Sequence, residues 1–401
     1  MKSPSTWQPA IGFSDRMAIT LKIATSFKTA FPESDTSQSQ AEARGIESSI
    51  YKDASSKEDY YQRCYARIDQ LNRLTGDLDE QRPLPTRDPA EQSQKTGQVI
   101  GPYPNCTHYT TGLYSTIYKT RLTNSPQTLA LKLTMPSQCQ PPHNPKREAR
   151  IITAAKHPNI IPLLETHTLP SSHLLLVFPF QPLDLATLLL EHQPLRTQQA
   201  KSIIHDLFSA LARLHSLGVI HRDIKPSNIL LSSISTPSTA YLADFGIAWS
   251  KSDPASEPPT QKITDIGTTS YRPPELLFGR QNYSYEIDLW AAGCVVAEIV
   301  EGRGHDWALF DAGELGSELA LVKSIFETLG TPDEEVWPEA KELPDWGKMT
   351  FVEFPGKDWG QILPNASAKG RDLVGQLVRY QSSERLSAEE VLKHAFLQGD
   401  K

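Results

Sequence analysis

The residues whose chemistry is most specific lie in one stretch, His221–Asn228, which reads His-Arg-Asp-Ile-Lys-Pro-Ser-Asn. It places the carboxylate of Asp223, the ammonium of Lys225 and the carboxamide of Asn228 in a single short loop. Phosphoryl transfer uses these groups together: a carboxylate orients the attacking hydroxyl, a cation stabilises the transferring group, and an amide oxygen helps to hold a divalent metal ion. Sixteen residues after Asn228, Asp244 opens the triplet Asp-Phe-Gly and offers a second hard oxygen ligand.

In this order the motifs resemble the catalytic core of a eukaryotic protein kinase, in the serine/threonine form of the loop. Lys132 ends Ala-Leu-Lys, which is similar to the strand whose lysine holds the α- and β-phosphates, and Glu148 stands where the partner glutamate is expected. Asp-Phe-Gly alone would be a weak signal, but the ordered set is specific. The resemblance implies ATP and Mg²⁺ as cofactors, with Asn228 and Asp244 on the metal. It also implies a threonine that contacts the catalytic loop, here Thr268.

The resemblance covers roughly residues 105–397, about 70% of the chain. It implies an α+β, bilobal protein kinase fold, with a small β-rich N-lobe at about 101–182 and a larger helical C-lobe at about 183–397. The residue patterns agree with that order. Strands are predicted at Tyr114–Arg121, Thr128–Thr134 and Leu174–Phe178, with a turn at Asn124–Gln127. Helices are predicted at Thr197–Ser216, Glu286–Val300, Leu315–Leu329, Gly370–Tyr380 and Ala388–Leu392.

Residues 1–100 form an N-terminal extension that we predict to be mostly disordered. Segment 32–56 is polar with few aliphatic residues, which is typical of disorder. Segment 57–75 has apolar residues at helical spacing behind a capping pair, so it predicts a helix. An isolated helix of this length is marginal, and both a linker helix and a docking helix fit the pattern. Gln81–Lys95 is a polar linker that contains proline.

Composition narrows the function classes. A net charge of −7 gives no reason to expect a nucleic-acid-binding surface. No apolar run approaches the roughly 20 residues of a membrane span, and the N-terminus lacks the apolar core of a signal peptide, so no membrane partner is expected. Four widely spaced cysteines indicate neither a zinc site nor a disulfide framework. A reducing compartment follows, and we expect the nucleus and/or the cytoplasm.

The ATP pocket follows from the resemblance residue by residue. It would be formed by an adenine sandwich, a bulky gatekeeper at Phe178, and a hinge in which Pro179 needs only its carbonyl. The positions that match are Tyr109, Gly112, Ile117, Ala130, Lys132, Phe178, Pro179, Gln181, Leu230 and Ala243.

Within the kinases, Tyr271–Gly279 (Tyr-Arg-Pro-Pro-Glu-Leu-Leu-Phe-Gly) resembles the cyclin-dependent kinase branch. The resemblance implies a buried ion pair between Glu275 and Arg385, and a role for Asp288 in holding the backbone of the catalytic loop. Arg272 implies a substrate pocket that tolerates proline after the phospho-acceptor.

The Gly-rich loop departs from the pattern, because its three glycine positions hold Thr110, Gly112 and Ser115. Two side chains in this loop should stiffen it and weaken ATP binding. This motivates an alternative function, a pseudokinase scaffold that binds proteins through its kinase domain and its N-terminal helix. Against it, every charged or amide group of the phosphoryl-transfer chemistry is present.

The control elements also depart from the pattern. Asn144 and Pro145 predict a helix start there, but Lys146 replaces the apolar residue that a cyclin would bury, which argues against standard cyclin binding. Trp249 replaces an arginine that, with Arg147 and Arg222, would grip an activating phosphothreonine. We predict that this ring packs under the helix and holds Glu148 inward. The nearest phospho-acceptor in that segment is Thr264, and Tyr114 matches a position of inhibitory phosphorylation.

The sequence therefore predicts a serine/threonine kinase of the cyclin-dependent type that needs little or no help from a cyclin. Its partners would be protein substrates, other kinases among them. The altered cyclin helix, the weakened phosphate cluster and the Tyr271–Gly279 segment together resemble the single-subunit, fungal-type kinases that activate cyclin-dependent kinases.

Overall fold

The structure is a computed structural model of the 401-residue chain. It describes residues 13–31, 36–54, 57–74, 97–112, 114–122, 127–190, 195–233, 238–304, 307–313 and 316–398. The chain divides into two compact units, Met1–Gln92 and Ser93–Lys401. None of the described helices is both long and apolar enough to cross a membrane. The predicted linker at 81–95 and most of the predicted turn at 124–127 lie outside the described residues.

The N-terminal unit consists of three helices, α1 (Phe13–Ala30), α2 (Thr36–Asp53) and α3 (Lys57–Leu74). α3 lies where the capping pattern predicts a helix, whereas the prediction of disorder at 32–56 is wrong for the residues of α2. The composition of segment 32–56 does not predict α2, because this helix is stabilised by contacts with the other two helices. Glu47 is buried, accepts two hydrogen bonds from Arg16 of α1 at 2.7 and 2.8 Å, and accepts a third from the Tyr60 hydroxyl of α3 at 2.8 Å.

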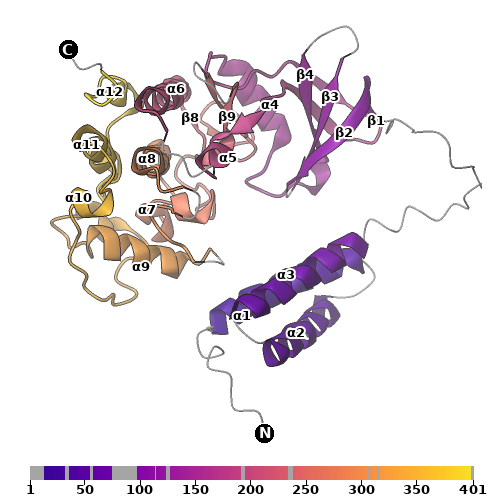
Figure 1. The fold of residues 1–401 in the computed structure, drawn as a ribbon, viewed down its shortest axis with the longest axis horizontal. Coiled ribbons are helices and arrows are strands. Elements are labelled where there is room, and N and C mark those ends of the chain that lie inside the picture. Colours follow the sequence, from indigo (N-terminus) through magenta and orange to yellow (C-terminus); the bar gives the residue numbers. More distant parts are fainter. Residues whose placement is uncertain are drawn as a thin grey trace, which may run out of the picture. The chain divides into compact units, whose positions relative to one another are not determined.

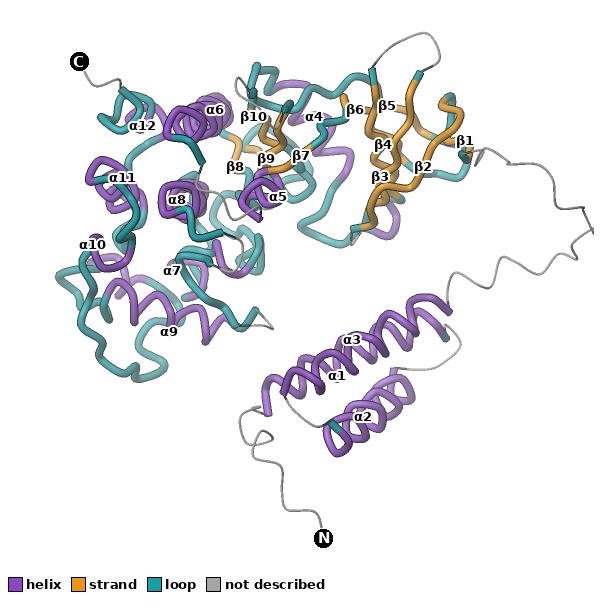
Figure 2. The backbone as a smooth tube through the Cα atoms, viewed as in Figure 1, coloured by secondary structure: helices purple, strands orange, loops and turns teal. Residues whose placement is uncertain are grey.

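The second unit begins with an antiparallel six-stranded sheet in the order β1-β2-β3-β4-β6-β5 (Figures 1 and 2). Its strands are β1 (Gln98–Ile100), β2 (Tyr103–Thr111), β3 (Ser115–Arg121), β4 (Thr128–Thr134), β5 (Glu165–Thr168) and β6 (Leu174–Pro179). The unit starts slightly before the predicted boundary at residue 101, because β1 pairs with β2 and Ile100 is buried against the sheet.

Helix α4 (Pro145–Ala154) is the main helix of this lobe. It begins where the sequence predicts: the Asn144 side chain accepts from the backbone N–H of Arg147 at 2.9 Å, and Pro145 occupies the first turn. The backbone N–H of Asn144 also donates to the carbonyl of Gly246 at 2.9 Å. The start of α4 is therefore tied to the Asp-Phe-Gly segment.

The remainder of this unit is mainly helical (Figure 1). Its core includes the buried side chains of Trp290, Trp337 and Phe208. The helices are α5 (Leu185–Leu190), α6 (Thr197–Ser216), α7 (Pro274–Leu277), α8 (Glu286–Glu301), α9 (Glu318–Leu329), α10 (Trp359–Ile362), α11 (Ala368–Leu377) and α12 (Ala388–Val391), with short strands β7 (Leu183–Asp184), β8 (Val219–Ile220), β9 (Ile229–Leu231), β10 (Ala240–Leu242) and β11 (Trp249–Ser250). The predicted order of a β-rich lobe followed by a helical lobe is confirmed.

Helix boundaries differ from the predictions where capping residues decide them. α9 begins at Glu318 rather than Leu315, because the Ser317 side chain caps it and Gly316 has a left-handed φ of +66°. α11 begins at Ala368 rather than Gly370, because the Ser367 side chain accepts from the backbone N–H of Gly370. In both cases the first residue of the helix is set by the capping serine before it, and the apolar periodicity alone does not predict it.

Two buried contacts secure the base of the site. Arg385 donates to both carboxylate oxygens of Glu275 at 2.6 and 2.8 Å, and both side chains are almost fully buried. The carboxylate of Asp288 accepts from the backbone N–H groups of His221 and Arg222, both at 2.9 Å. Both contacts match the sequence predictions.

Candidate active site

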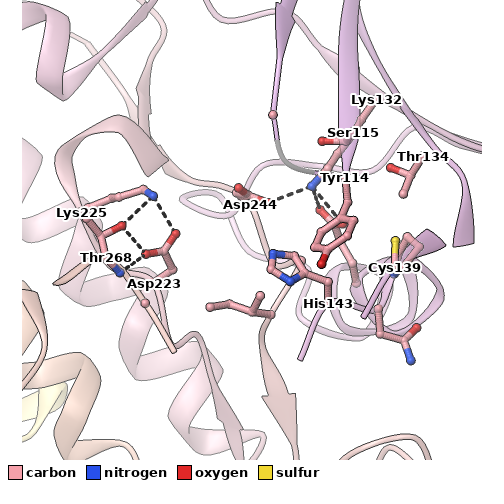
Figure 3. Close-up of a pocket in the computed structure, with 17 residues that line it drawn as sticks. Tyr114, Ser115, Lys132, Thr134, Cys139, His143, Asp223, Lys225, Asp244 and Thr268 are labelled. Atoms are coloured by element: carbon pink, nitrogen blue, oxygen red, sulfur yellow. Dashed lines mark hydrogen bonds and ion pairs between the residues drawn. The ribbon is translucent and has the colours of Figure 1, made fainter. Parts of the chain in front are cut away.

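A cavity of about 390 Å³ opens between the sheet and the helical lobe (Figure 3). It brings together side chains from β3, β4 and α4 on one side and from the catalytic loop and the Asp-Phe-Gly segment on the other. The predicted site residues among its lining are Gly112, Lys132, Glu148, Asp223, Lys225, Asp244 and Thr268. Residues widely separated in the chain thus meet in one cavity.

Lys132 is the centre of one half of the site. Its Nζ donates to the two carboxylate oxygens of Glu148 at 2.7 and 3.0 Å, and to Asp244 at 2.8 Å. Burial alone would lower the pKa of Lys132, but the charges of Asp244 and Glu148 outweigh it and raise that pKa. The ammonium of Lys132 in turn holds the pKa of Asp244 well below its usual range. This half is therefore a fixed ammonium between two carboxylates, with α4 turned inward.

Asp223 is the centre of the other half. Its Oδ1 accepts from the backbone N–H of Thr268 at 3.0 Å and from the Thr268 hydroxyl at 2.9 Å, while Lys225 Nζ lies 2.9 Å from its Oδ2. Lys225 also donates to the Thr268 hydroxyl at 2.8 Å. Asn228 donates to the backbone carbonyl and the Oδ2 of Asp223, at 2.8 and 3.0 Å. Three groups thus fix the orientation of one carboxylate that faces the cavity.

Two residues at these centres have left-handed backbones, Arg222 with φ of +73° and Asp244 with φ of +62°. Such angles are uncommon outside glycine and cost free energy unless the surroundings enforce them. At Arg222 the surroundings include the bond from its N–H to Asp288, and the His221 ring, which lies 3.0 Å from the Ala243 carbonyl. Asn105 and Ser172 also have positive φ, but within the site the left-handed residues lie in the two motifs that supply Asp223 and Asp244.

The donor set fits Mg²⁺. Asp244 offers a carboxylate and Asn228 an amide oxygen, both hard ligands, and Mg²⁺ is usually held by one or two protein groups together with substrate phosphates. Among the described residues no cluster of three or more His, Cys, Asp or Glu forms a site made of protein ligands alone. A metal here would therefore complete its shell with water or phosphate oxygens.

The residues predicted for the adenine end lie beside the cavity rather than in its lining. Ala130 faces Phe178 across the β4–β6 ladder, and Ile117 faces Lys132 across β3–β4. Tyr109 meets Phe180 of the hinge edge-on, with ring centroids 5.2 Å apart. Pro179 ends β6 and Gln181 follows it, while Leu230 lies on β9 and Ala243 directly follows β10. Their part in binding adenine stays a prediction.

The Gly-rich loop positions have ordinary backbones. Thr110 pairs with Ile117, Ser115 begins β3, and neither has a positive φ. The N–H of Gly112 donates to the carbonyl of Ser115 at 2.8 Å, which closes the hairpin, and Leu113 lies outside the described residues. The missing glycines therefore impose no left-handed strain here; their effect on ATP binding stays a prediction.

Sequence reasoning missed the contact between the loop and α4. The Tyr114 ring lies 4.6 Å, centroid to centroid, from the ring of His143, just before α4, and both line the cavity (Figure 3). Burial lowers the pKa of His143, which favours the neutral ring. No motif indicates this pair, because it depends on how the hairpin folds over the site.

The prediction that Trp249 packs under the helix is wrong. Its ring belongs to a C-lobe cluster that includes Ile247, Ile266 and Tyr283. Its indole N–H donates to the carbonyl of Glu257 at 2.9 Å. Trp249 is on β11, paired with β8, and this pairing directs the ring into the C-lobe instead of toward α4.

Comparison with known proteins agrees with this geometry. The model of the protein kinase domain matches residues 108–397. The chain is also similar to the serine/threonine-protein kinase csk1 of Schizosaccharomyces pombe, with 36% identity over 290 residues, which is 71% of this chain and 91% of that protein.

Proposed function

The chain belongs to the protein kinase family, and on this basis we propose that it is an active serine/threonine kinase of the cyclin-dependent type, which needs little or no help from a cyclin and phosphorylates other kinases. The observation that carries the proposal is the cavity in which Lys132, Glu148 and Asp244 face Asp223, Lys225 and Thr268. Kinases in general use ATP and Mg²⁺.

In the proposed reaction each half of the site has its own task. Lys132, held by Glu148, would bind the α- and β-phosphates; Asp244 and Asn228 would hold Mg²⁺, which would supply neutralisation of the phosphate charge. Asp223 orients the substrate hydroxyl and accepts its proton, and Lys225 stabilises the transferring phosphoryl group. Thr268 holds both Asp223 and Lys225 in place through its hydroxyl.

Independence from a cyclin is supported by the position of α4. The residue that a cyclin would contact, Lys146, is exposed and charged. Contacts within the chain draw the helix toward the site: the pair between Lys132 and Glu148, and the hydrogen bond from Asn144 to Gly246. The inward position of α4 is therefore stabilised by contacts within this chain, without a cyclin.

Two further parts of the proposal concern substrates and place. The action on other kinases is supported by the resemblance of the Tyr271–Gly279 segment and the altered cyclin helix to single-subunit kinases of that role. The proposed compartment is the nucleus and/or the cytoplasm, supported by the four free cysteines.

The test uses the purified chain alone, with ATP and Mg²⁺, on a generic protein substrate and on a catalytically dead cyclin-dependent kinase. We expect transfer to both, at the activation-segment threonine of the dead kinase. Asp223→Asn should abolish transfer while the melting temperature still rises on adding ATP and Mg²⁺. Transfer that begins only after adding a cyclin contradicts cyclin independence, and no transfer under any condition favours the pseudokinase scaffold.

A further inference from the structure

Two arginines are buried at the junction of α4, the catalytic loop and the segment after Asp-Phe-Gly. Arg147 precedes Glu148, and Arg222 precedes Asp223, so each stands next to a residue of the proposed site. Their side chains are 3% and 0% exposed. A buried guanidinium is costly unless an anion compensates its charge, so this junction requires one.

Glu257 supplies that anion. Its two carboxylate oxygens lie 3.0 and 3.4 Å from Nη1 of Arg222, and Oε2 lies 3.8 Å from Nη1 of Arg147. Its side chain is only 16% exposed, and its backbone carbonyl is held by the indole N–H of Trp249. Burial would raise the pKa of Glu257, but the charges of Arg222 and Arg147 together with the hydrogen bonds to its carboxylate outweigh burial and lower that pKa, so the carboxylate stays ionised.

The same segment is tied to α4 a second time. Asp253 accepts two hydrogen bonds from Arg150, at 2.6 and 2.9 Å, and the carbonyl of Ala255 accepts from Arg147 at 3.1 Å. Residues 253–257 are therefore joined to the helix through Arg147 and Arg150, and to the catalytic loop through Arg222. The segment holds together the two elements that must be aligned for transfer.

The junction has more donors than Glu257 satisfies. Nε of Arg147, and Nε and Nη2 of Arg222, are buried without a hydrogen-bond partner in the described part of the chain. Lys262 adds a further buried cation nearby, over the rings of Trp249 and Tyr283. The junction is thus cationic overall, and an oxyanion from solution should enter it if the Glu257 carboxylate is removed.

We propose that Glu257 is a positioning residue that permanently takes the place of an activating phosphate: it holds Arg222 and Arg147, and through them Asp223 and Glu148, in the arrangement for transfer. The proposal rests on the proposed kinase function. It makes activity independent of phosphorylation in the activation segment, because the anion is encoded in the chain. Asp253 helps to keep Glu257 in place, because it fixes the segment to Arg150 of α4.

The experiment compares Glu257→Gln and Glu257→Ala with wild type and with a matched control, Glu353→Gln, an exposed glutamate remote from the junction. We expect Glu257→Gln to lower kcat by about tenfold or more, a change of about 1.4 kcal/mol in the barrier, with little change in the KM for ATP. The control should keep wild-type rates. Sodium sulfate should restore part of the activity of Glu257→Ala, beyond sodium chloride at equal ionic strength, without accelerating wild type.

A second measurement serves if the variants do not fold: wild type is treated with a phosphatase until mass spectrometry shows no phosphate, then assayed. Full retained activity supports the proposal. Loss of activity on dephosphorylation, or wild-type kcat in Glu257→Gln, overturns it. Failure of the kinase proposal is seen separately, since wild type would then transfer no phosphate in any state.

Discussion

Removing the buried partner of Arg385 gives a sharp test of how the activation segment is anchored. In Glu275→Ala the guanidinium loses both carboxylate bonds while its charge stays buried. Breaking such a pair costs about 3–5 kcal/mol in the free energy of unfolding. Arg385 keeps three backbone acceptors, the carbonyls of Arg379, Tyr380 and Glu286. We therefore expect the lower end, about 3 kcal/mol.

The matched control is Glu384→Ala, which removes the surface pair with Arg379, where the two side chains are 59% and 43% exposed. Exposed pairs contribute about 0–1 kcal/mol. Urea unfolding followed by tryptophan fluorescence measures both variants, and Trp290, whose ring lies 5.0 Å from the Arg385 guanidinium, is a local probe. The melting temperature of Glu275→Ala should fall by roughly 6–12 °C, from about 2–4 °C per kcal/mol.

A loss in Glu275→Ala no larger than that in Glu384→Ala would refute this reasoning, because it would mean that the three carbonyls alone compensate the buried charge. A double variant, Glu275→Leu with Arg385→Met, removes the charge as well as the pair. It should recover part of the stability, since apolar replacement of a buried ion pair is often neutral.

Three further predictions follow from single side chains. Thr264→Ala should keep activity within about tenfold of wild type in a peptide assay, because the anion at the junction is Glu257, and a larger loss would show that phosphorylation controls the segment. Burial raises the pKa of Glu298 to about 8, so from about pH 5 to 8 the folded state retains a proton that the unfolded state releases, and stability falls as the pH rises. The side chain of Glu298→Gln can still accept the hydrogen bond from the Tyr271 hydroxyl but cannot titrate. This variant should therefore show a smaller difference in melting temperature between pH 5.5 and pH 8 than wild type does. Nε of Arg272 donates to the carbonyl of Gly267 at 3.1 Å, so that carbonyl needs no N–H from the substrate. Arg272→Ala should therefore lower kcat/KM for a peptide with proline after the phospho-acceptor about fivefold more than for the same peptide with alanine there. An equal loss for both peptides would contradict this.

The sequence predicts those parts of the site in which each residue belongs to a motif with fixed spacing. The resemblance that these ordered motifs carry predicts Lys132, Glu148, Asp223, Asn228, Asp244 and Thr268, and the structure brings them together. The start of α4 was also predictable, because capping is local chemistry between Asn144 and Arg147. The order of the two lobes, β-rich and then helical, was also predictable from where the strand and helix patterns lie along the chain.

What the sequence did not predict depends on contacts between distant segments. Glu257 lies in a proline-containing stretch with no motif, and only the fold places it beside Arg222. Trp249 was assigned to the wrong neighbour, since its direction is set by the pairing of β11 with β8. Helix α2 is polar in composition, and its buried Glu47 is satisfied by two other helices.

The hydrogen bond between Asn144 and Gly246 has a consequence for inhibitor design. A compound that reached behind Lys132 would have to pass the bulky, nearly buried Phe178 and displace Asp244 from its bond to Lys132. It would also have to break the bond from Asn144 to Gly246, and so pull on the first turn of α4. Ligands that leave the Asp-Phe-Gly segment in place avoid all three costs. Compounds shaped for the inward arrangement are therefore the better starting point for chemical probes of this enzyme.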